Sequence, residues 1–232
     1  MPKLRGRAMF CGLPDSGLVG KIAIDRVVDS VKPKLVADIY SPHLPPQVLI
    51  NNKGVIGLIG HHLYFSQKQR MFMYTGDSQP LDSDGAYELS RMVVGLARKF
   101  GVTELVVLAA MIKGAAVEHA QVFVSATSKE LAKEYVSLGA AVTSLGTVTW
   151  MHGLILGEAL KRGVNCACLS GETQGELPDP KAADALLRIV GKRFGLKMKI
   201  SRVKETRGAG TLKQISSEQK ETERKKEPTY IG

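Results

Sequence analysis

The sequence predicts an α/β fold whose central strands run parallel, and two stretches carry this prediction. Ala8–Cys11 is typical of a buried strand, the cluster Gly12–Gly17 of a tight turn, and the periodic residues after it of a helix. Leu105–Ala110 is continuously apolar, as expected of a parallel strand covered on both faces. With 232 residues, the chain is long enough for one such domain with its own core.

The first helix and the turn before it have a mechanical explanation. The helix is predicted from an apolar stripe at positions i, i+3, i+4 and i+7, and Pro33 ends it. The stripe consists of Ile24, Val27, Val28 and Val31. The turn needs glycine for a positive φ, and Gly20 lets the helix lie close to the sheet, where a Cβ would hold the two apart. The free N–H groups of the turn would suit an anion or a carboxylate from elsewhere in the chain.

Three ligand-binding motifs have glycine-rich turns that are comparable with this one. The turn lacks an essential residue of each motif. A phosphate-binding P-loop has Lys-Ser/Thr after its second glycine, whereas Leu18 follows Gly17. The dinucleotide fingerprint needs Gly-x-Gly, which Leu13 and Pro14 interrupt. A nucleophile elbow needs a glycine two residues before Ser16, where Pro14 stands. The turn is therefore interpreted as structural, with ligand binding as the alternative.

The remaining elements are predicted in chain order. Strands are expected over Leu35–Tyr40, Gln47–Ile50, Val55–Ile59, Met71–Thr75, Leu105–Ala110, Gln121–Ser125 and Asn165–Ser170. Helices are expected over segments with apolar faces at Ala86–Phe100, Leu131–Leu138, Met151–Leu160 and Ala183–Phe194. Asn51–Gly54 is a hairpin signal. Ser128 and Asp179 are expected to cap helices, which Gly101 and Gly139 are expected to end.

The net charge of +10 permits binding to nucleic acid or to an acidic partner. The basic residues are scattered, few aromatic residues accompany them, and the densest basic runs lie near the end of the chain. Charge alone reports solubility and non-specific attraction. A solvated basic tail is therefore favoured over specific nucleic-acid binding.

Cysteine and histidine positions bear on compartment and metal binding. Cys11, Cys166 and Cys168 are expected in the core, the last two on one face of a strand. The histidines and cysteines do not stand at metal-ligand spacing, so no metal or other cofactor is predicted. The first residues lack the apolar region of a signal peptide, and Leu105–Ile112 is too short to cross a bilayer. We therefore expect a reduced, cytoplasmic protein.

The composition changes near the end of the chain. Residues 1–205 are assigned to the α/β domain and residues 206–232 to a flexible charged tail, because the tail offers almost nothing to bury. After Ile215, apolar residues return only at the tip, Tyr230, Ile231 and Gly232. This tip has two interpretations: a segment that docks into a partner with its terminal carboxylate as a handle, or a frayed end.

Polar residues at the predicted strand ends are the candidates for chemistry. These ends gather at one edge of a parallel sheet, where ligands usually bind. Asp77 and Glu172 would form a carboxylate pair for acid/base work if they met there. The alternative is that they accept hydrogen bonds from loop amides. His61 and His62 are adjacent and would point to opposite faces of a strand.

Short motifs in the loops, taken together and in order, carry a resemblance. Their residues are Gly12, Pro14, Gly17 and Gly20; Pro45 and Pro46; Gly76, Asp77 and Gln79; and Gly171, Glu172 and Thr173. Gly153, Gly157 and Asp179 extend the series. The set resembles the proteasome assembly chaperone 2 family in its archaeal form, over roughly residues 7–203.

The resemblance implies a three-layer α/β/α sandwich with a mostly parallel central sheet, similar to the phosphorylase/hydrolase class of folds. It also implies homo-oligomers that bind proteasome core subunits during assembly, without catalysis. Members that dock on the proteasome end in a hydrophobic residue, tyrosine and any residue, whereas Tyr230 is one position out of that register. The leading hypothesis is a non-enzymatic assembly chaperone helped by its tail. The alternative is a nucleotide- or nucleoside-handling enzyme that uses Asp77 and Glu172.

Overall fold

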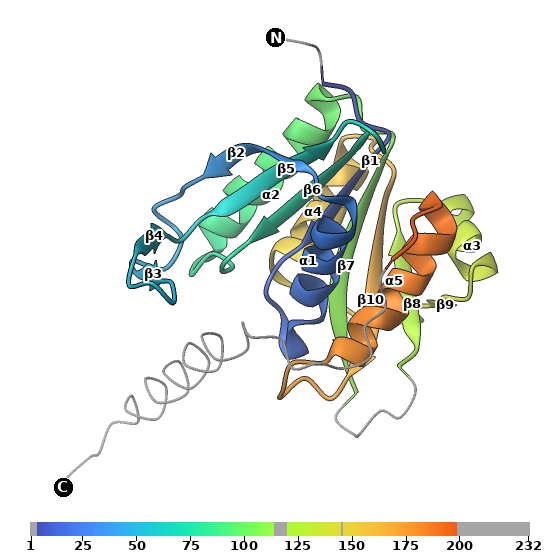
Figure 1. The fold of residues 1–232 in the computed structure, drawn as a ribbon. Coiled ribbons are helices and arrows are strands. Elements are labelled where there is room, and N and C mark those ends of the chain that lie inside the picture. Colours follow the sequence, from blue (N-terminus) through green and yellow to red (C-terminus); the bar gives the residue numbers. More distant parts are fainter. Residues whose placement is uncertain (1–3, 114–119, 145, 199–232) are drawn as a thin grey trace, which may run out of the picture. The chain divides into compact units, whose positions relative to one another are not determined.

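An eight-stranded sheet forms the middle layer of the fold (Figure 1). The structure is a computed structural model that describes residues 4–113, 120–144 and 146–198. The strand order is β2-β5-β6-β1-β7-β10-β8-β9. The strands are β1 (Ala8–Gly12), β2 (Lys34–Ile39), β5 (His61–Ser66), β6 (Met71–Gly76), β7 (Glu104–Ile112), β8 (Val122–Ala126), β9 (Ala141–Val142) and β10 (Cys166–Thr173).

The four central strands run in one direction. β6 and β7 lie on either side of β1, and β10 lies beside β7, all parallel. Antiparallel pairings attach β5 to β6, β2 to β5 and β8 to β10, and the short β9 is parallel to β8. The carboxyl ends of the four central strands therefore meet at the lower edge of the sheet in Figure 1. This confirms a mostly parallel sheet.

Helices cover both faces of this sheet. They are η1 (Ser16–Leu18), α1 (Val19–Val31), α2 (Ser83–Lys99), α3 (Lys129–Ser137), α4 (Trp150–Lys161) and α5 (Pro180–Phe194). Side chains alternate along β1, so Ala8 and Phe10 pack with residues of α1, α3 and α5, whereas Met9 and Cys11 pack with residues of α2 and α4. The two cores give the three-layer α/β/α sandwich that the sequence led us to expect.

Local signals in the sequence are confirmed at the helix ends. The Ser128 side chain accepts a hydrogen bond from the N–H of Leu131, and Asp179 accepts bonds from two N–H groups at the start of α5. Gly101 and Gly139 have φ of +63° and +109° after α2 and α3. The predicted helices are all present, with ends shifted by a few residues.

A separate two-stranded sheet projects beside the main one. β3 (Val48–Ile50) and β4 (Ile56–Leu58) are antiparallel, and Asn51–Gly54 forms the turn between them, as predicted. β5 and β9 were not predicted. The alternation of buried Leu63 and Phe65 with partly exposed neighbours in β5 is a strand signal that the histidines at its start obscured.

The three cysteines are buried free thiols, as expected. Cys166 and Cys168 point to the same face of β10 and join Cys11 in the core below α2 and α4. Burial raises the pKa of Cys168 to about 12, so the thiol is neutral. In the described part of the chain, every helix is too short or too polar to traverse a lipid bilayer. The tail assigned to residues 206–232, with Tyr230, Ile231 and Gly232, lies outside the described residues.

Candidate functional site

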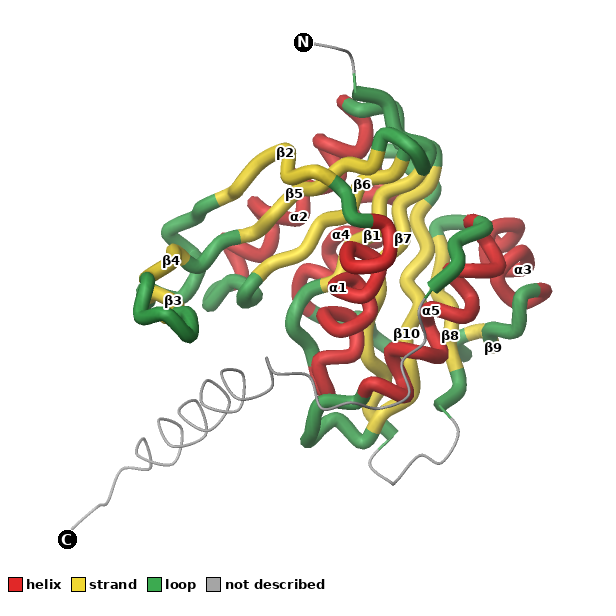
Figure 2. The backbone as a smooth tube through the Cα atoms, in the orientation of Figure 1, coloured by secondary structure: helices red, strands yellow, loops and turns green. Residues whose placement is uncertain are grey.

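The candidate site is the edge of the sheet where the four parallel strands end. The loops after β1 and β10 are among the green segments at the lower edge of the tube (Figure 2), and the loop after β6 follows the end of the strand beside β1. The motif residue Asp77 follows β6, Glu172 and Thr173 end β10, and the glycine-rich turn joins β1 to α1. The sequence therefore predicted correctly which loops meet. The contacts of these side chains show whether they could form a catalytic site or instead hold the loops together.

The amino terminus of α1 is filled by a carboxylate from its own turn. Both oxygens of Asp15 lie 3.1 Å from the backbone nitrogen of Gly20, which donates to them. Burial raises the pKa of Asp15 to about 8, although backbone N–H groups, those of Gly20 and Ala110 among them, act in the opposite direction. The place that would suit the phosphate of a ligand is taken by this side chain. The structural interpretation of the turn is therefore favoured.

Gly17 joins this turn to the loop between β10 and α5. Its φ is +64°, its N–H donates to the carbonyl of Gly175 at 3.0 Å, and its own carbonyl accepts the N–H of Asp179 at 2.8 Å. A Cβ on Gly17 would lie 2.9 Å from the hydroxyl of Thr173. That hydroxyl donates to Asp179 at 2.9 Å. The backbone of Gly17 therefore joins the two loops, and Thr173 supports the loop that receives it by bonding Asp179 within that loop.

Gln79 connects three segments. Its amide nitrogen donates to the carbonyl of Pro14 at 2.8 Å, and its amide oxygen accepts the N–H of Met151 at 3.3 Å. One side chain thus joins the turn after β1 and the loop after β6 to the start of α4. This arrangement explains why the loop needs an amide, which donates and accepts at once.

Gln79→Ala is expected to lower the free energy of unfolding by about 2 kcal/mol, because a carbonyl and an N–H lose their partner. Gln79→Glu, which keeps an acceptor for Met151 and loses the donor to Pro14, is expected to fall between the variant and the wild type. Urea denaturation followed by circular dichroism measures both. An unchanged midpoint for Gln79→Ala would show that the bridge contributes nothing.

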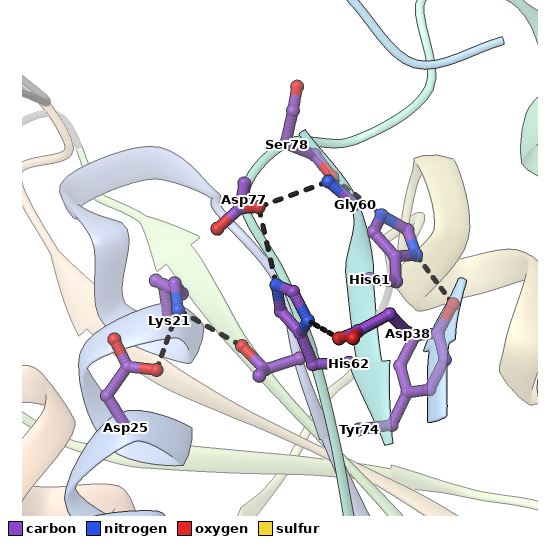
Figure 3. Close-up of polar contacts among 10 residues, drawn as sticks. Lys21, Asp25, Asp38, Gly60, His61, His62, Tyr74, Asp77 and Ser78 are labelled. Carbon is purple, nitrogen blue, oxygen red and sulfur yellow. Dashed lines mark hydrogen bonds and ion pairs between the residues drawn. The ribbon is translucent and has the colours of Figure 1, made fainter. Parts of the chain in front are cut away.

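A polar network surrounds Asp77 at the end of β6 (Figure 3). Its carboxylate accepts the N–H of Gly60 at 3.1 Å and lies 3.4 Å from Nε2 of His62, whose Nδ1 is 2.7 Å from Asp38. Partial burial opposes ionisation of Asp77, but the contacts with His62 and Gly60 outweigh it and hold its pKa below the usual value. The bond to Asp77 also raises the pKa of His62. The network ties β2, β5 and β6 together.

His61 points to the other face of β5, as expected (Figure 3). Its Nε2 is 2.8 Å from the carbonyl of Ser78, which only accepts, so Nε2 carries the proton. Nδ1 then accepts the hydroxyl of Tyr74 at 2.5 Å. Burial lowers the pKa of His61, which keeps the ring neutral. Gly76 leaves the space for this ring, since a Cβ there would overlap it.

Lys21, the cation nearest the turn, is already engaged. Its Nζ is 2.7 Å from Asp25 and 3.2 Å from the hydroxyl of Thr75 (Figure 3). In the described residues, no group of three or more His, Cys, Asp or Glu side chains is placed to hold a metal ion. The edge is thus occupied by internal pairs.

The expected pair of Asp77 and Glu172 does not form. β1 and β7 lie between the strands that carry them, a separation of about 14 Å at the usual spacing of neighbouring strands. Glu172 is buried and has its own partners: Lys113 at 2.7 Å and the N–H of Gln121 at 3.4 Å. The two carboxylates therefore cannot share a proton or a substrate atom. The sequence placed them on the correct edge but not at the correct distance.

The other motif residues allow close packing of a helix on the sheet or line a groove. A Cβ on Gly171 would lie 3.0 Å from the carbonyl of Ala182 in α5, so glycine allows a close approach. Pro45 and Pro46 line a groove of about 430 Å³ between the end of β2 and the β3–β4 hairpin. The contact of Asp38 with His62 was missed, because β5 was not predicted and its place beside β2 is a long-range pairing.

The charge of His62 makes stability depend on pH. Its folded pKa lies above the ordinary value of 6.5, so its contribution is complete below pH 6.5 and is lost as the pH rises through the folded pKa. His62→Gln is expected to lose about 1 kcal/mol or less at pH 6, after solvent screening, and still less at pH 9. Urea denaturation of both proteins at the two pH values tests this. An equal loss at both would contradict the charged contact.

Comparisons with known proteins place the chain among relatives. A family model described as the PAC2 family matches residues 9–209. An uncharacterized protein of Methanocaldococcus jannaschii is 31% identical over 186 residues, which cover 79% of this chain and 72% of that protein. PbaB of Pyrococcus furiosus, described as an archaeal proteasome activator, has a TM-score of 0.78 at 29% identity, covering 98% of this chain and 96% of that one.

A second Pyrococcus furiosus protein is also similar. PbaA, described as an archaeal homolog of proteasome-assembly chaperone, has a TM-score of 0.77 at 26% identity, with 97% of this chain and 89% of that one covered. A Thermoplasma acidophilum protein shares the fold with a TM-score of 0.82 at 22% identity, covering 97% of this chain and 92% of that one. Because the family model spans most of the sequence and the glycine-turn, Gln79 and Thr173 motifs fall within it, the chain belongs to the PAC2 family.

Proposed function

We propose that this protein is a non-enzymatic proteasome assembly chaperone that self-associates and binds proteasome core subunits. PbaB and PbaA, which are similar to it over nearly their whole lengths, are described as a proteasome activator and as a homolog of proteasome-assembly chaperone. The tail over residues 206–232, with Tyr230, Ile231 and Gly232 at its tip, takes part in capturing the partner. The protein acts in the cytoplasm, a proposal that its three buried free thiols support.

The observation that carries this proposal is the use of the motif residues as braces. Asp15 accepts the N–H of Gly20 in the first turn of α1, Thr173 donates to Asp179 within the β10–α5 loop, and Gln79 joins three segments. Asp77 and Glu172, the candidate catalytic acids, each accept a backbone N–H bond. Two strands, β1 and β7, lie between the strands that carry them. Polar residues that bond within the domain make it a rigid platform, whose outer surfaces then bind other proteins.

The test is direct capture. Tagged full-length protein is mixed with purified proteasome core subunits, first the α-type and then the β-type, and the bound fraction is analysed by gel and by mass photometry. Saturable capture of one type, with a defined stoichiometry, supports the proposal. Absence of capture of either type at micromolar concentrations would contradict it.

Titration with purine nucleosides and nucleotides tests the enzymatic alternative. The separation of Asp77 from Glu172 removes the acid/base pair on which that alternative relied. Isothermal titration is therefore expected to show no saturable binding. Saturable binding that is lost in Glu172→Gln would instead favour an enzyme.

A further inference from the structure

The β3–β4 hairpin exposes one apolar face. Val48 pairs with Leu58 and Ile50 with Ile56, so these four side chains stand on the same side of the hairpin. They are 45%, 61%, 63% and 66% exposed, in that order. We call them the hairpin face. On the opposite side Leu49 is partly buried and packs against the core below α2 and α4.

An apolar groove lies beside the hairpin face. It has a volume of about 430 Å³ and is open to the surface. Its walls include Tyr40, Pro42, Pro45 and Pro46, and the hairpin face supplies Val48 and Leu58. Tyr40 is itself more than half exposed. Projecting side chains and a groove that would receive them thus occur on one continuous surface.

This surface carries little charge in a strongly basic protein. Between residues 41 and 60, Lys53 at the tip of the hairpin is the single Lys, Arg, Asp or Glu, whereas the whole chain carries +10. Two copies of the chain repel each other over most of their surfaces. Two copies can approach each other at this nearly uncharged surface. An acidic partner would gain nothing from its charge there.

The size and composition of the surface fit one side of an interface. Six apolar side chains are about half exposed or more: Tyr40, Val48, Ile50, Val55, Ile56 and Leu58. Together they expose roughly 200–400 Å² of apolar area, at 60–120 Å² for a whole side chain. One side of a standard interface buries roughly 450 Å² of apolar area. The surface therefore supplies about half of it or more.

We propose that the hairpin face and its groove are the contact through which a second copy of this chain binds. The contact is isologous: the hairpin of each copy enters the groove of the other about a two-fold axis. Aliphatic, charge-depleted surfaces are characteristic of permanent contacts between identical chains. The inference rests on the self-association in the proposed function and assigns a surface to it.

The test measures mass in solution. Full-length protein at micromolar concentration is expected to sediment at twice 25.1 kDa or more. Ile50→Glu/Ile56→Glu is expected to sediment at half the wild-type mass or less, because carboxylates would face each other across the axis. Leu160→Glu is the matched control, because Leu160 is 62% exposed on α4. The oligomer of this variant is expected to keep the wild-type mass.

Chemical cross-linking tests the same contact without disturbing it by charge. The three native cysteines are buried, so Ile56→Cys adds one exposed thiol to the chain. A short bis-maleimide is expected to join two copies of Ile56→Cys and not two copies of Leu160→Cys. This result remains informative if the double glutamate variant fails to fold.

Other outcomes overturn the inference and separate it from the proposed function. If the wild type is monomeric and still captures proteasome subunits, the proposed self-contact is wrong and the proposed chaperone function stands. If Leu160→Glu lowers the mass of the oligomer and Ile50→Glu/Ile56→Glu does not, the contact between copies lies on α4. If Ile50→Glu/Ile56→Glu keeps its mass but loses capture, the hairpin face binds the proteasome subunit and not a second copy.

Discussion

Gly20→Ala is expected to lower the free energy of unfolding by about 3 kcal/mol, the upper end of the usual cost of overpacking, because backbone would have to move. A Cβ on Gly20 would overlap the carbonyl oxygen of Leu108 in β7. Both partners are main chain, so no side chain can rotate away. α1 would have to move from the sheet, which would pull its buried residues Ile24 and Val27 from the core.

The same movement would break the cap of α1. The N–H of Gly20 is the donor to Asp15, so displacement of the helix leaves the buried carboxyl group of Asp15 with fewer partners. The loss is therefore expected to exceed that of Gln79→Ala, which disturbs hydrogen bonds without moving a helix. Urea and thermal denaturation give both values on one scale.

Gly95→Ala is the matched control. Gly95 lies inside α2, and a Cβ there would meet no heavy atom within 4 Å in the described residues. Alanine is favoured over glycine in a helix by about 1 kcal/mol, so this variant is expected to be more stable than the wild type. Equal changes for the two variants would show that the close approach of α1 to β7 is not what Gly20 provides.

The turn that holds Gly20 could be predicted from the sequence because its signals are local. A strand, a glycine-rich turn and an amphipathic helix follow one another within about two dozen residues, and the chemistry of each is contained in that stretch. The positive φ of Gly17 and the close approach at Gly20 follow from properties of glycine alone. The caps at Ser128 and Asp179 were predictable for the same reason.

The distance between Asp77 and Glu172 could not be predicted, because it depends on the order of strands in the sheet. Both residues follow parallel strands, and any order would bring them to the same edge. Only the insertion of β1 and β7 between their strands separates them. The contact of Asp38 with His62 was missed for a related reason: it depends on the pairing of β2 with β5, which no local pattern encodes.

The fate of the polar residues connects the fold to the proposed function. Family motifs rich in Gly, Pro, Asp and Gln read equally well as a ligand site or as a set of braces until their partners are known. Here Asp15 and Thr173 bind groups of their own loops, and Gln79 binds two neighbouring segments. These polar side chains hold the loops in place, which supports the proposal that a partner is bound by other surfaces of the chain.

Deletion of residues 206–232 is expected to abolish capture of the proteasome core subunit and to leave the mass of the oligomer unchanged. The expectation rests on composition: this segment is polar and charged for most of its length and apolar at Tyr230 and Ile231. We propose that this segment binds by placing its short apolar tip in a pocket of the partner. Sedimentation and capture, run on the same preparation, measure the two properties separately.

A shorter deletion shows which part of the tail binds. Removing only residues 228–232 keeps the basic run Arg224–Lys226 and takes away Tyr230 and Ile231. If the tip docks, this variant loses capture as fully as the long deletion does, and added salt changes wild-type capture little. If the basic run binds, the short deletion keeps capture, which then falls as rising salt screens the charges. Capture that survives the long deletion would assign recognition to the α/β/α body, where the hairpin face is then the place to mutate.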